Sequence, residues 1–276
     1  KEMISAVGEQ HFRTLKTEGN LNNRYGVPMM LSQLGSEHEA AVIEMGISEF
    51  GEMRLLTRMV RPTIAVYTTI GHAHLEFLHD LDGVLRAKTE MLELMPETAP
   101  VVVNGDDEKL RGLQCRQRKI TYGFGPHCDV RAENLKIGEQ QSCDIVCGLR
   151  RIPVRIPAFG QHYVYAALAA AAVGMLLGLD DREIADGIAA FHNVGRRGET
   201  FCSSGITVVD DSYNANPDSV CNGIDNLILM PAGRHVCILG DMLELGENTL
   251  KMHYDVGNYA REKGIDLVLT SGNCAC

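Results

Sequence analysis

The 276-residue sequence has no tryptophan and no surplus of positive charge. Its 26 lysine and arginine residues stand against 36 aspartate and glutamate residues, which gives a formal net charge of −10 at pH 7. No stripe of Lys and Arg is present, so nucleic-acid binding is not expected as the main function. The apolar fraction of 45% and the charged fraction of 22% are typical of a globular protein with one large domain or two moderate ones.

The chain also lacks paired CxxC units, although it contains nine cysteines. Their odd number and scattered spacing give little support to a disulfide framework or to a zinc site. We interpret them as small, mostly buried side chains in a reducing compartment, which favours a cytoplasmic location.

No long hydrophobic run is present. The longest apolar stretch, residues 163–179, is mostly alanine and is too short and too weakly hydrophobic for a bilayer span, so it predicts a buried helix. No signal peptide opens the chain. The first residues, KEMI, are typical of the middle of a helix, so the sequence is expected to be a fragment.

Strand and helix patterns alternate in the first half of the chain. Residues 40–44, 63–69 and 101–103 predict strands, the first of them buried, and residues 52–60 and 81–95 predict helices that end before prolines. This order predicts an α/β fold with a mostly parallel sheet and helices on both faces. Between residues 122 and 157, short alternating segments such as 128–137 and 151–156 predict a small antiparallel sheet, inserted or at the edge.

The second half restarts the same rhythm after two helices. Residues 162–177 and 181–191 predict those helices, the latter capped by Asp180 or Asp181, and residues 193–198 form a polar, glycine-rich hinge. Strands are then predicted at 206–209, 235–239 and 266–269, with helices from Pro217 and over 250–263. We place a domain boundary near residue 200, which gives domains of 1–200 and 201–276, the second of them incomplete.

Polar residues at the ends of parallel strands are the first candidates for chemistry, because ligands bind there. Glu44 is typical either of a magnesium ligand or of a salt-bridged or capping glutamate. His72, His74 and Glu76 follow the next strand, and they indicate either a metal or anion site or ordinary loop residues. Lys88 indicates either a third residue of the same site as Glu44 and His74 or an ordinary lysine on a solvated helix face.

The run DDSYNANP at 210–217 places two acids at a strand end and two asparagines before a helix-starting proline. Such residues bind ribose or adenine, but plain turns use them too. Two phosphate-binding motifs are missing. The GxG that begins at Gly123 has Cys128 where a dinucleotide fingerprint needs glycine, and no GxxxxGK[ST] occurs.

Several runs together resemble the Mur ligases. They are KTEGNLNNRYGVP (16–28), VIEMG (42–46), GE (51–52), AHLE (73–76), AKTEM (87–91), DDSYNANPDSV (210–220) and LGDMLELG (239–246). The resemblance implies a central ATPase domain followed by part of a Rossmann-like C-terminal domain. It also implies that the sequence begins just after the P-loop, so that the isolated chain lacks ligase activity.

The resemblance assigns roles to particular residues. Glu44, His74 and Lys88 would hold Mg²⁺ at two sites, with Lys88 carried as a carbamate, and these residues and Arg197 would be catalytic. The nucleotide contacts would come from Arg197, Asp211, Asn214, Asn216 and His162. The residues facing the sugar-peptide substrate would be Thr17, Asn20, Asn22 and Asn23.

The implied reaction is ATP-dependent amide formation between UDP-N-acetylmuramoyl-tripeptide and D-alanyl-D-alanine, through an acyl phosphate, in peptidoglycan precursor synthesis. The implied protein is a monomer without nucleic-acid or membrane partners. Thr69 and Ala166 stand where the family has asparagine, and Arg196 stands where it has methionine or leucine. The alternatives are another Mur or folylpolyglutamate-type ligase, or a non-catalytic descendant that binds a nucleotide or a partner. An oxidoreductase is disfavoured by the missing GxGxxG.

Overall fold

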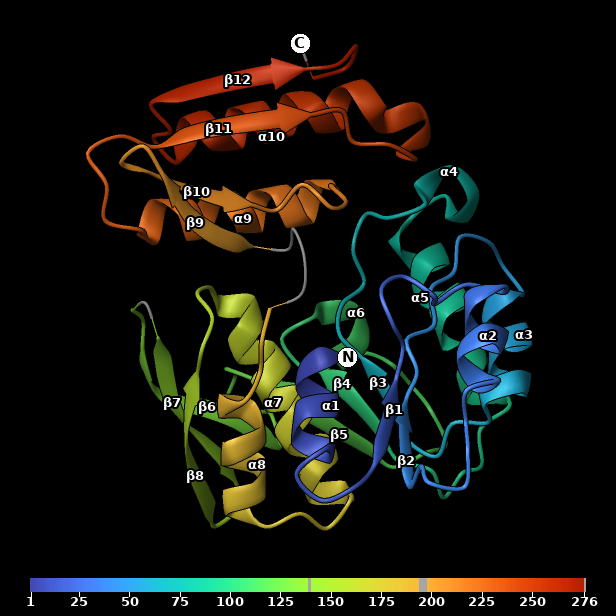
Figure 1. The fold of residues 1–276 in the computed structure, drawn as a ribbon. Coiled ribbons are helices and arrows are strands. Elements are labelled where there is room, and N and C mark those ends of the chain that lie inside the picture. Colours follow the sequence, from blue (N-terminus) through green and yellow to red (C-terminus); the bar gives the residue numbers. More distant parts are fainter. Residues whose placement is uncertain (139, 194–197, 276) are drawn as a thin grey trace. The chain divides into compact units, whose positions relative to one another are not determined.

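The computed structural model describes residues 1–138, 140–193 and 198–275 (Figure 1). The contacts divide the chain into two compact units. Unit 1 consists of Lys1–Ile70 and Leu85–His192, and unit 2 consists of Gly71–Val84 and Asn193–Cys276. The segment Gly71–Val84 therefore packs with residues that follow it by more than a hundred positions.

A six-stranded sheet in the order β3-β4-β5-β6-β7-β8 forms the centre of unit 1. Its first four strands are parallel, and β6, β7 and β8 continue it as antiparallel neighbours. The predicted mixture of a parallel and a small antiparallel sheet is confirmed, with the antiparallel strands extending one edge of the main sheet. The strands are β3 (Ala65–Tyr67), β4 (Val101–Asn104), β5 (Lys119–Gly123), β6 (Val130–Lys136), β7 (Gln141–Cys147) and β8 (Arg150–Ile156).

Helices cover both faces of this sheet. Val102 of β4 joins the cluster around α7, while Val101 and Val103 point to the opposite face and are equally buried. The helices described in unit 1 are α1 (Glu2–Gly8), α2 (Gly26–Leu31), α3 (Glu52–Val60), α6 (Glu108–Arg111), α7 (Gln161–Leu176) and α8 (Asp181–Ala189). Helix α5 (Leu81–Thr89) continues into the 3-10 turn η1 (Glu90–Glu93).

The helix ends follow the sequence signals. Asp180 caps α8, and its carboxylate accepts the Glu183 N–H while the Glu183 side chain accepts the Asp180 N–H. Helix α3 ends at Val60, before Arg61 in the left-handed conformation and Pro62. The predicted helices over 52–60, 162–177 and 181–191 are confirmed within one or two residues.

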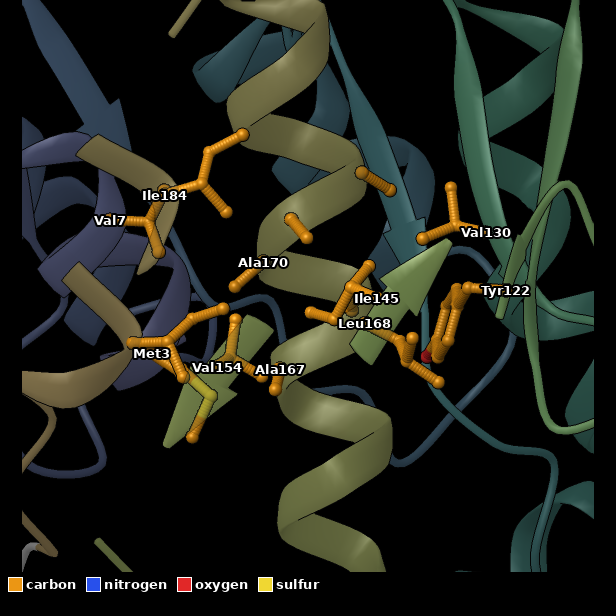
Figure 2. Close-up of a cluster of buried hydrophobic side chains, with 14 of the residues drawn as sticks. Met3, Val7, Tyr122, Val130, Ile145, Val154, Ala167, Leu168, Ala170 and Ile184 are labelled. Atoms are coloured by element: carbon orange, nitrogen blue, oxygen red, sulfur yellow. The ribbon is translucent and has the colours of Figure 1, made fainter. Parts of the chain in front are cut away.

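Helix α7 is the core of unit 1. Side chains from α1, α8 and the sheet gather around Ala167, Leu168 and Ala170 (Figure 2). The alanines of this helix let neighbouring backbones approach closely, and the helix is buried on most of its circumference. The predicted buried helix is confirmed. Among the described residues, none of the helices combines the length and apolarity that a bilayer crossing needs.

Strand β2 (Ala40–Val42) differs from its prediction. It pairs in parallel with β1 (Thr14–Lys16), a strand that the sequence pattern did not reveal, in a separate two-stranded sheet. Residues 40–42 are partly or fully exposed, so the expectation of a buried strand is wrong. An apolar run has high strand propensity, but it does not say how many layers will cover it.

Unit 2 is a smaller α/β unit. An antiparallel pair joins β9 (Glu199–Ser203) and β10 (Ile206–Asp210), and a parallel pair joins β11 (Val236–Gly240) and β12 (Leu267–Ser271). Ile224, Cys237 and Ala260 form one buried cluster, and Met242, Leu245 and Val256 form another. Its helices are α4 (Leu75–Leu78), α9 (Pro217–Leu229), η2 (Gly246–Asn248) and α10 (Thr249–Glu262). The strands at 206–209, 235–239 and 266–269 and the helix from Pro217 are confirmed, and β9 was not predicted.

Candidate functional site

The carboxylate of Glu44 lies just past the carboxyl end of β2, in unit 1. Thr17 Oγ1 accepts the backbone N–H of Glu44 at 2.9 Å, and Asn22 donates from Nδ2 to Glu44 Oε1 at 2.7 Å. The Lys1 ammonium lies 3.3 Å from the other oxygen, Oε2. The structure therefore brings three predicted site residues together, since Thr17, Asn22 and Glu44 share one hydrogen-bonded arrangement.

This arrangement keeps Glu44 ionised. Burial by itself raises the pKa of the Glu44 carboxyl, but the hydrogen bond from Asn22 and the charge of Lys1 outweigh that effect, and the pKa falls below its usual value. The side chain keeps 31% of its surface exposed. A cation from solvent can therefore reach a carboxylate that is charged at neutral pH.

The four predicted substrate residues have unlike environments. Thr17 is completely buried and fixes the backbone at Glu44, so its hydroxyl is a structural support. Asn23 Oδ1 accepts the N–H groups of Tyr25 and Gly26 at 3.0 and 2.9 Å, which starts helix α2. Asn20 is exposed on the loop. Asn22 bonds to the Glu44 carboxylate itself, whereas Thr17 bonds to the Glu44 backbone.

Lys88 belongs to helix α5, and its side chain reaches the backbone just past the carboxyl end of β3. Its Nζ donates to the carbonyl oxygen of Thr69 at 3.1 Å, and its own carbonyl accepts from the Tyr67 hydroxyl at 3.2 Å. Burial lowers the pKa of the Lys88 amine, and the charge of Asp107 opposes that shift in part. The neutral amine therefore forms more readily than in a fully solvated lysine, and the Lys88 residue is half-buried.

Asp107 is a residue that sequence reasoning missed. Its Oδ2 accepts the Thr69 hydroxyl at 3.2 Å and the Ile70 N–H at 2.8 Å, and its Oδ1 caps helix α6 through the Leu110 N–H. Asp107 thus fixes the end of β3 from which Lys88 is held. The signal that could have found it is its place after the apolar strand β4, which is the rule that selected Glu44.

His74 belongs to unit 2, where its ring contacts an acid of the C-terminal part of the chain. His74 Nδ1 lies in close contact with the Glu244 carboxylate, and Glu244 O accepts the Glu76 N–H at 3.3 Å. His72 is held in the same way, because Asp218 Oδ2 accepts its backbone N–H at 2.6 Å and lies 3.0 Å from its ring Nδ1. Asp218 and Glu244 were not predicted, since nothing local in the sequence links them to residues 72–76.

The predicted nucleotide residues of unit 2 lie at the start of α9. Asn216 is the N-cap, and its side-chain oxygen accepts the Ser219 N–H at 2.9 Å. Asp211 and Asn214 are exposed, and the Asp211 carboxylate lies near Gly223 of the same helix. Asn216 therefore has a structural role whether or not it also binds a ligand.

The remaining predicted residues lie elsewhere. His162 lies in the first turn of α7 in unit 1, its ring is tilted against Tyr163 with centroids 4.0 Å apart, and desolvation of the ring lowers its pKa. Arg197 and Arg196 lie outside the described residues, as does most of the predicted hinge. The shared magnesium site of Glu44, His74 and Lys88 stays a prediction.

Two family descriptions match the chain. "Mur ligase middle domain" matches residues 1–174, and "Mur ligase, glutamate ligase domain" matches residues 196–274. The chain belongs to the Mur ligase family. The UDP-N-acetylmuramoyl-tripeptide–D-alanyl-D-alanine ligase of Escherichia coli (strain K12) is 36% identical over 281 residues, which are 99% of this chain and 61% of that protein.

Solved structures of the same family have the same fold. Crystal structure I of MurF from Acinetobacter baumannii has a TM-score of 0.92 at 30% identity and covers 100% of this chain and 61% of that one. MurF ligase from Thermotoga maritima in complex with ADP has a TM-score of 0.86 at 24% identity, covering 98% of this chain and 67% of that one. The chain spans about 60% of the length of the curated relatives that it matches.

Proposed function

We propose that this chain is part of an ATP-dependent ligase that joins D-alanyl-D-alanine to UDP-N-acetylmuramoyl-tripeptide. The observation that carries the proposal is the match of 99% of the chain to relatives of that name, at 34–36% identity. The surroundings of Glu44 and Lys88 support it, because they lower the pKa of the Glu44 carboxyl, which favours a carboxylate ligand, and lower the pKa of the Lys88 amine, which favours carbamate formation. Residues 1–200 would be the ATPase-type domain and residues 201–276 part of the C-terminal domain.

The donor set of unit 1 fits a magnesium ion. Glu44 offers a hard, ionised carboxylate oxygen with the Asn22 amide beside it, and oxygen donors are the ligands that Mg²⁺ prefers. Lys88 fits only after conversion to a carbamate, which needs the neutral amine that its lowered pKa favours. His74 offers a nitrogen, which is less typical of magnesium. When bound, Mg²⁺ would neutralise phosphate charge.

The chain's own groups would bind the substrates, orient the reacting groups and exclude water. Asn22 would hold the Glu44 carboxylate in one orientation, and Thr69 would hold the Lys88 side chain. In the proposed reaction the tripeptide carboxylate attacks the γ-phosphorus of ATP, ADP leaves, and an acyl phosphate forms. The amine of D-alanyl-D-alanine then attacks the acyl carbon and phosphate leaves, which closes the amide. The nucleotide contacts in unit 2 would come from Asp211, Asn214 and Asn216. The loop that faces the substrate would be supported by Thr17, Asn20 and Asn23.

The experiment uses the full length that the gene encodes. Phosphate release is measured with ATP, UDP-N-acetylmuramoyl-tripeptide and D-alanyl-D-alanine, and then with each substrate left out. We expect release that needs all three, and its loss in Glu44→Gln and Lys88→Ala. Equal release when D-alanyl-D-alanine is replaced by glutamate would favour a folylpolyglutamate-type ligase.

Nucleotide binding separates a catalyst from a non-catalytic descendant. Calorimetry on the same protein is expected to show ADP binding that weakens without magnesium, consistent with the ADP complex of the Thermotoga maritima relative. ADP binding without phosphate release under any substrate combination would indicate a binding module.

A further inference from the structure

Three side chains with different metal-ligating atoms meet at another point of unit 1. Asp106 follows strand β4, and His127 and Cys128 follow strand β5, so the group lies at the carboxyl ends of two neighbouring parallel strands. One donor atom of each residue lies within 4.8 Å of the other two. No local pattern joins them, because Asp106 is 21 and 22 positions from the other two.

The spacing of the donors is close to that of a tetrahedral site. Asp106 Oδ1 lies 3.8 Å from His127 Nε2 and 3.9 Å from Cys128 Sγ. A tetrahedral zinc ion with bonds of about 2.0–2.3 Å places its ligand atoms roughly 3.3–3.5 Å apart. Contraction by about half an ångström at these two edges, with the His127 and Cys128 donors starting within 4.8 Å of each other, would therefore form the first coordination shell.

Two glycines make this convergence possible. A Cβ at Gly105 would lie 2.7 Å from Cys128 Sγ, and a Cβ at Gly125 would lie 2.2 Å from His127 Cε1. Any larger residue at either position would displace the thiol or the ring from the cluster. The close approach of the two donors to Asp106 thus depends on the backbone around them.

The carboxylate at the centre is held by groups outside the cluster. Asp106 accepts the N–H groups of Phe124 at 2.6 Å and Gly125 at 3.1 Å, and the Tyr165 hydroxyl at 3.0 Å. Hydrogen bonds of this kind orient a ligating carboxylate and raise metal affinity. Oδ1 keeps one of these bonds only, so it retains a lone pair for a cation.

The cluster is open on one side. The His127 side chain is 41% exposed and the Asp106 side chain 20% exposed, while Cys128 is 4% exposed. A cation can therefore enter past the histidine and reach a thiol at the back. A pairing of sulfur, imidazole and carboxylate is typical of zinc and of similar borderline ions, and atypical of magnesium.

We propose that Asp106, His127 and Cys128 form a binding site for a divalent transition-metal ion of the zinc class. Binding replaces the Cys128 thiol proton, which leaves to solvent, so one proton is released for each ion bound. His127 coordinates through Nε2 as the Nδ1-protonated tautomer, and it gives up its 2.9 Å hydrogen bond to the Gly105 carbonyl. The carbonyl oxygen or a water molecule completes the shell.

A nucleophilic role for the same thiol is disfavoured. Burial and the carboxylates of Asp106 and Asp129 raise the pKa of Cys128 to about 11, against smaller opposing effects of a backbone hydrogen bond with Gly125 and of Arg111. A reactive cysteine needs the opposite, because the thiolate is the nucleophile. The proposal is independent of the ligase function, so either is testable without the other.

The test is cobalt(II) titration of the reduced chain, because a thiolate–cobalt bond gives a charge-transfer band in the near ultraviolet. We expect one equivalent of Co²⁺ to produce the band and zinc to displace it. Cys128→Ser is expected to abolish the band, and His127→Asn to weaken Co²⁺ affinity on the order of 10–100-fold. Cys143→Ser, at an equally buried thiol outside the cluster, should leave both unchanged.

Three results would overturn the proposal. They are no band at millimolar Co²⁺, a band that survives Cys128→Ser, and unchanged affinity in His127→Asn. The last variant keeps the test decisive if Cys128→Ser fails to fold, because the His127 side chain is 41% exposed and its replacement removes the hydrogen bond to the Gly105 carbonyl rather than core packing. Circular dichroism of each variant identifies a folding defect.

Discussion

The Lys88 amine donates to the carbonyl oxygen of Thr69 at 3.1 Å, which joins helix α5 to the carboxyl end of strand β3. One neutral acceptor compensates only part of the cost of burying an ammonium group. Burial therefore lowers the pKa of Lys88 even though the Asp107 carboxylate favours the charge. A lowered amine pKa at this edge of the sheet is the property that a carbamate-forming lysine needs, because the neutral amine is the form that reacts.

Lys88→Met tests this through the pH dependence of folding. The unfolded chain binds more protons than the folded one between the lowered folded pKa and the unfolded value of about 10.4, so Lys88 lets stability rise with pH across that interval. We expect the free energy of unfolding of wild type to gain on that of Lys88→Met as pH rises toward 10. Denaturant melts of both proteins from pH 7 to 10 measure the difference between their free energies of unfolding. The titrations of Tyr67 and Tyr122 occur in both proteins, so they cancel in that difference. Parallel curves would contradict a buried, strained ammonium.

Asn22→Ala tests the arrangement around Glu44. Loss of a hydrogen bond to a charged, partly exposed group is expected to cost about 1–2 kcal/mol at pH 7 and to raise the pKa of Glu44. Glu44 stabilises the fold above its unfolded pKa of about 4.3, and that contribution is lost as pH falls through the folded value. The difference in the free energy of unfolding between Asn22→Ala and wild type should therefore narrow below pH 4, and denaturant melts across that pH range measure it. Asn20→Ala, in the exposed part of the same loop, is the control. An equal change in the pKa of Glu44 in both variants would contradict a specific role of the Asn22 hydrogen bond.

The sequence predicted the elements better than their surroundings. Asp180 and Pro217 mark helix starts through local chemistry, and both helices begin where expected. The burial of residues 40–44 was predicted wrongly, because burial of β2 depends on what covers it, and within the described part of the chain β1 is the one strand that pairs with it. Local patterns carry propensity, whereas layers are made by distant segments.

The candidate site shows the same division. Glu44 was found because it ends an apolar strand, and the run Thr17–Asn22 was found only through the family resemblance. The partners that hold the histidines, Asp218 and Glu244, lie 146 and 170 positions away from them. No periodicity or motif records such a distance, so these contacts needed the fold.

Asp218→Ala is expected to loosen the segment Gly71–Val84. Its carboxylate accepts the His72 N–H at 2.6 Å and contacts the His72 ring, so the variant loses both. We expect faster amide hydrogen exchange in peptides from residues 71–84, with no change in peptides from α7. Asp218→Asn keeps an acceptor oxygen and should fall between the two. Equal exchange in Asp218→Ala and wild type would show that the segment is held by other contacts.

Asn216 variants separate capping from ligand binding. Asn216→Ala removes the acceptor of the Ser219 N–H and is expected to cost about 0.5–2 kcal/mol of stability. Asn216→Ser keeps a capping oxygen, so its stability should stay within a few tenths of a kcal/mol of wild type. If the amide also contacts the nucleotide, both variants bind ADP more weakly in calorimetry. Unchanged ADP affinity in Asn216→Ser would reduce Asn216 to a cap.

Gly187→Ala tests the packing of helix α8 against α1, and Gly257→Ala in helix α10 is the contrasting control, with the opposite expected change in the free energy of unfolding. A Cβ at Gly187 would lie 2.5 Å from Val7 Cα and 2.8 Å from Ala6 O, and these are backbone atoms that move only with the helix. Gly187→Ala should therefore lower stability by about 1–3 kcal/mol, even though alanine favours a helix by about 1 kcal/mol. Gly257 lies in the exposed face of α10 with nothing within 4 Å of its Cβ position, so Gly257→Ala should raise stability by up to about 1 kcal/mol. Hydrogen exchange in peptides from α8 and from α10 reads each change in its own unit. A stabilising Gly187→Ala would mean that α8 is not seated on α1 as closely as the structure has it.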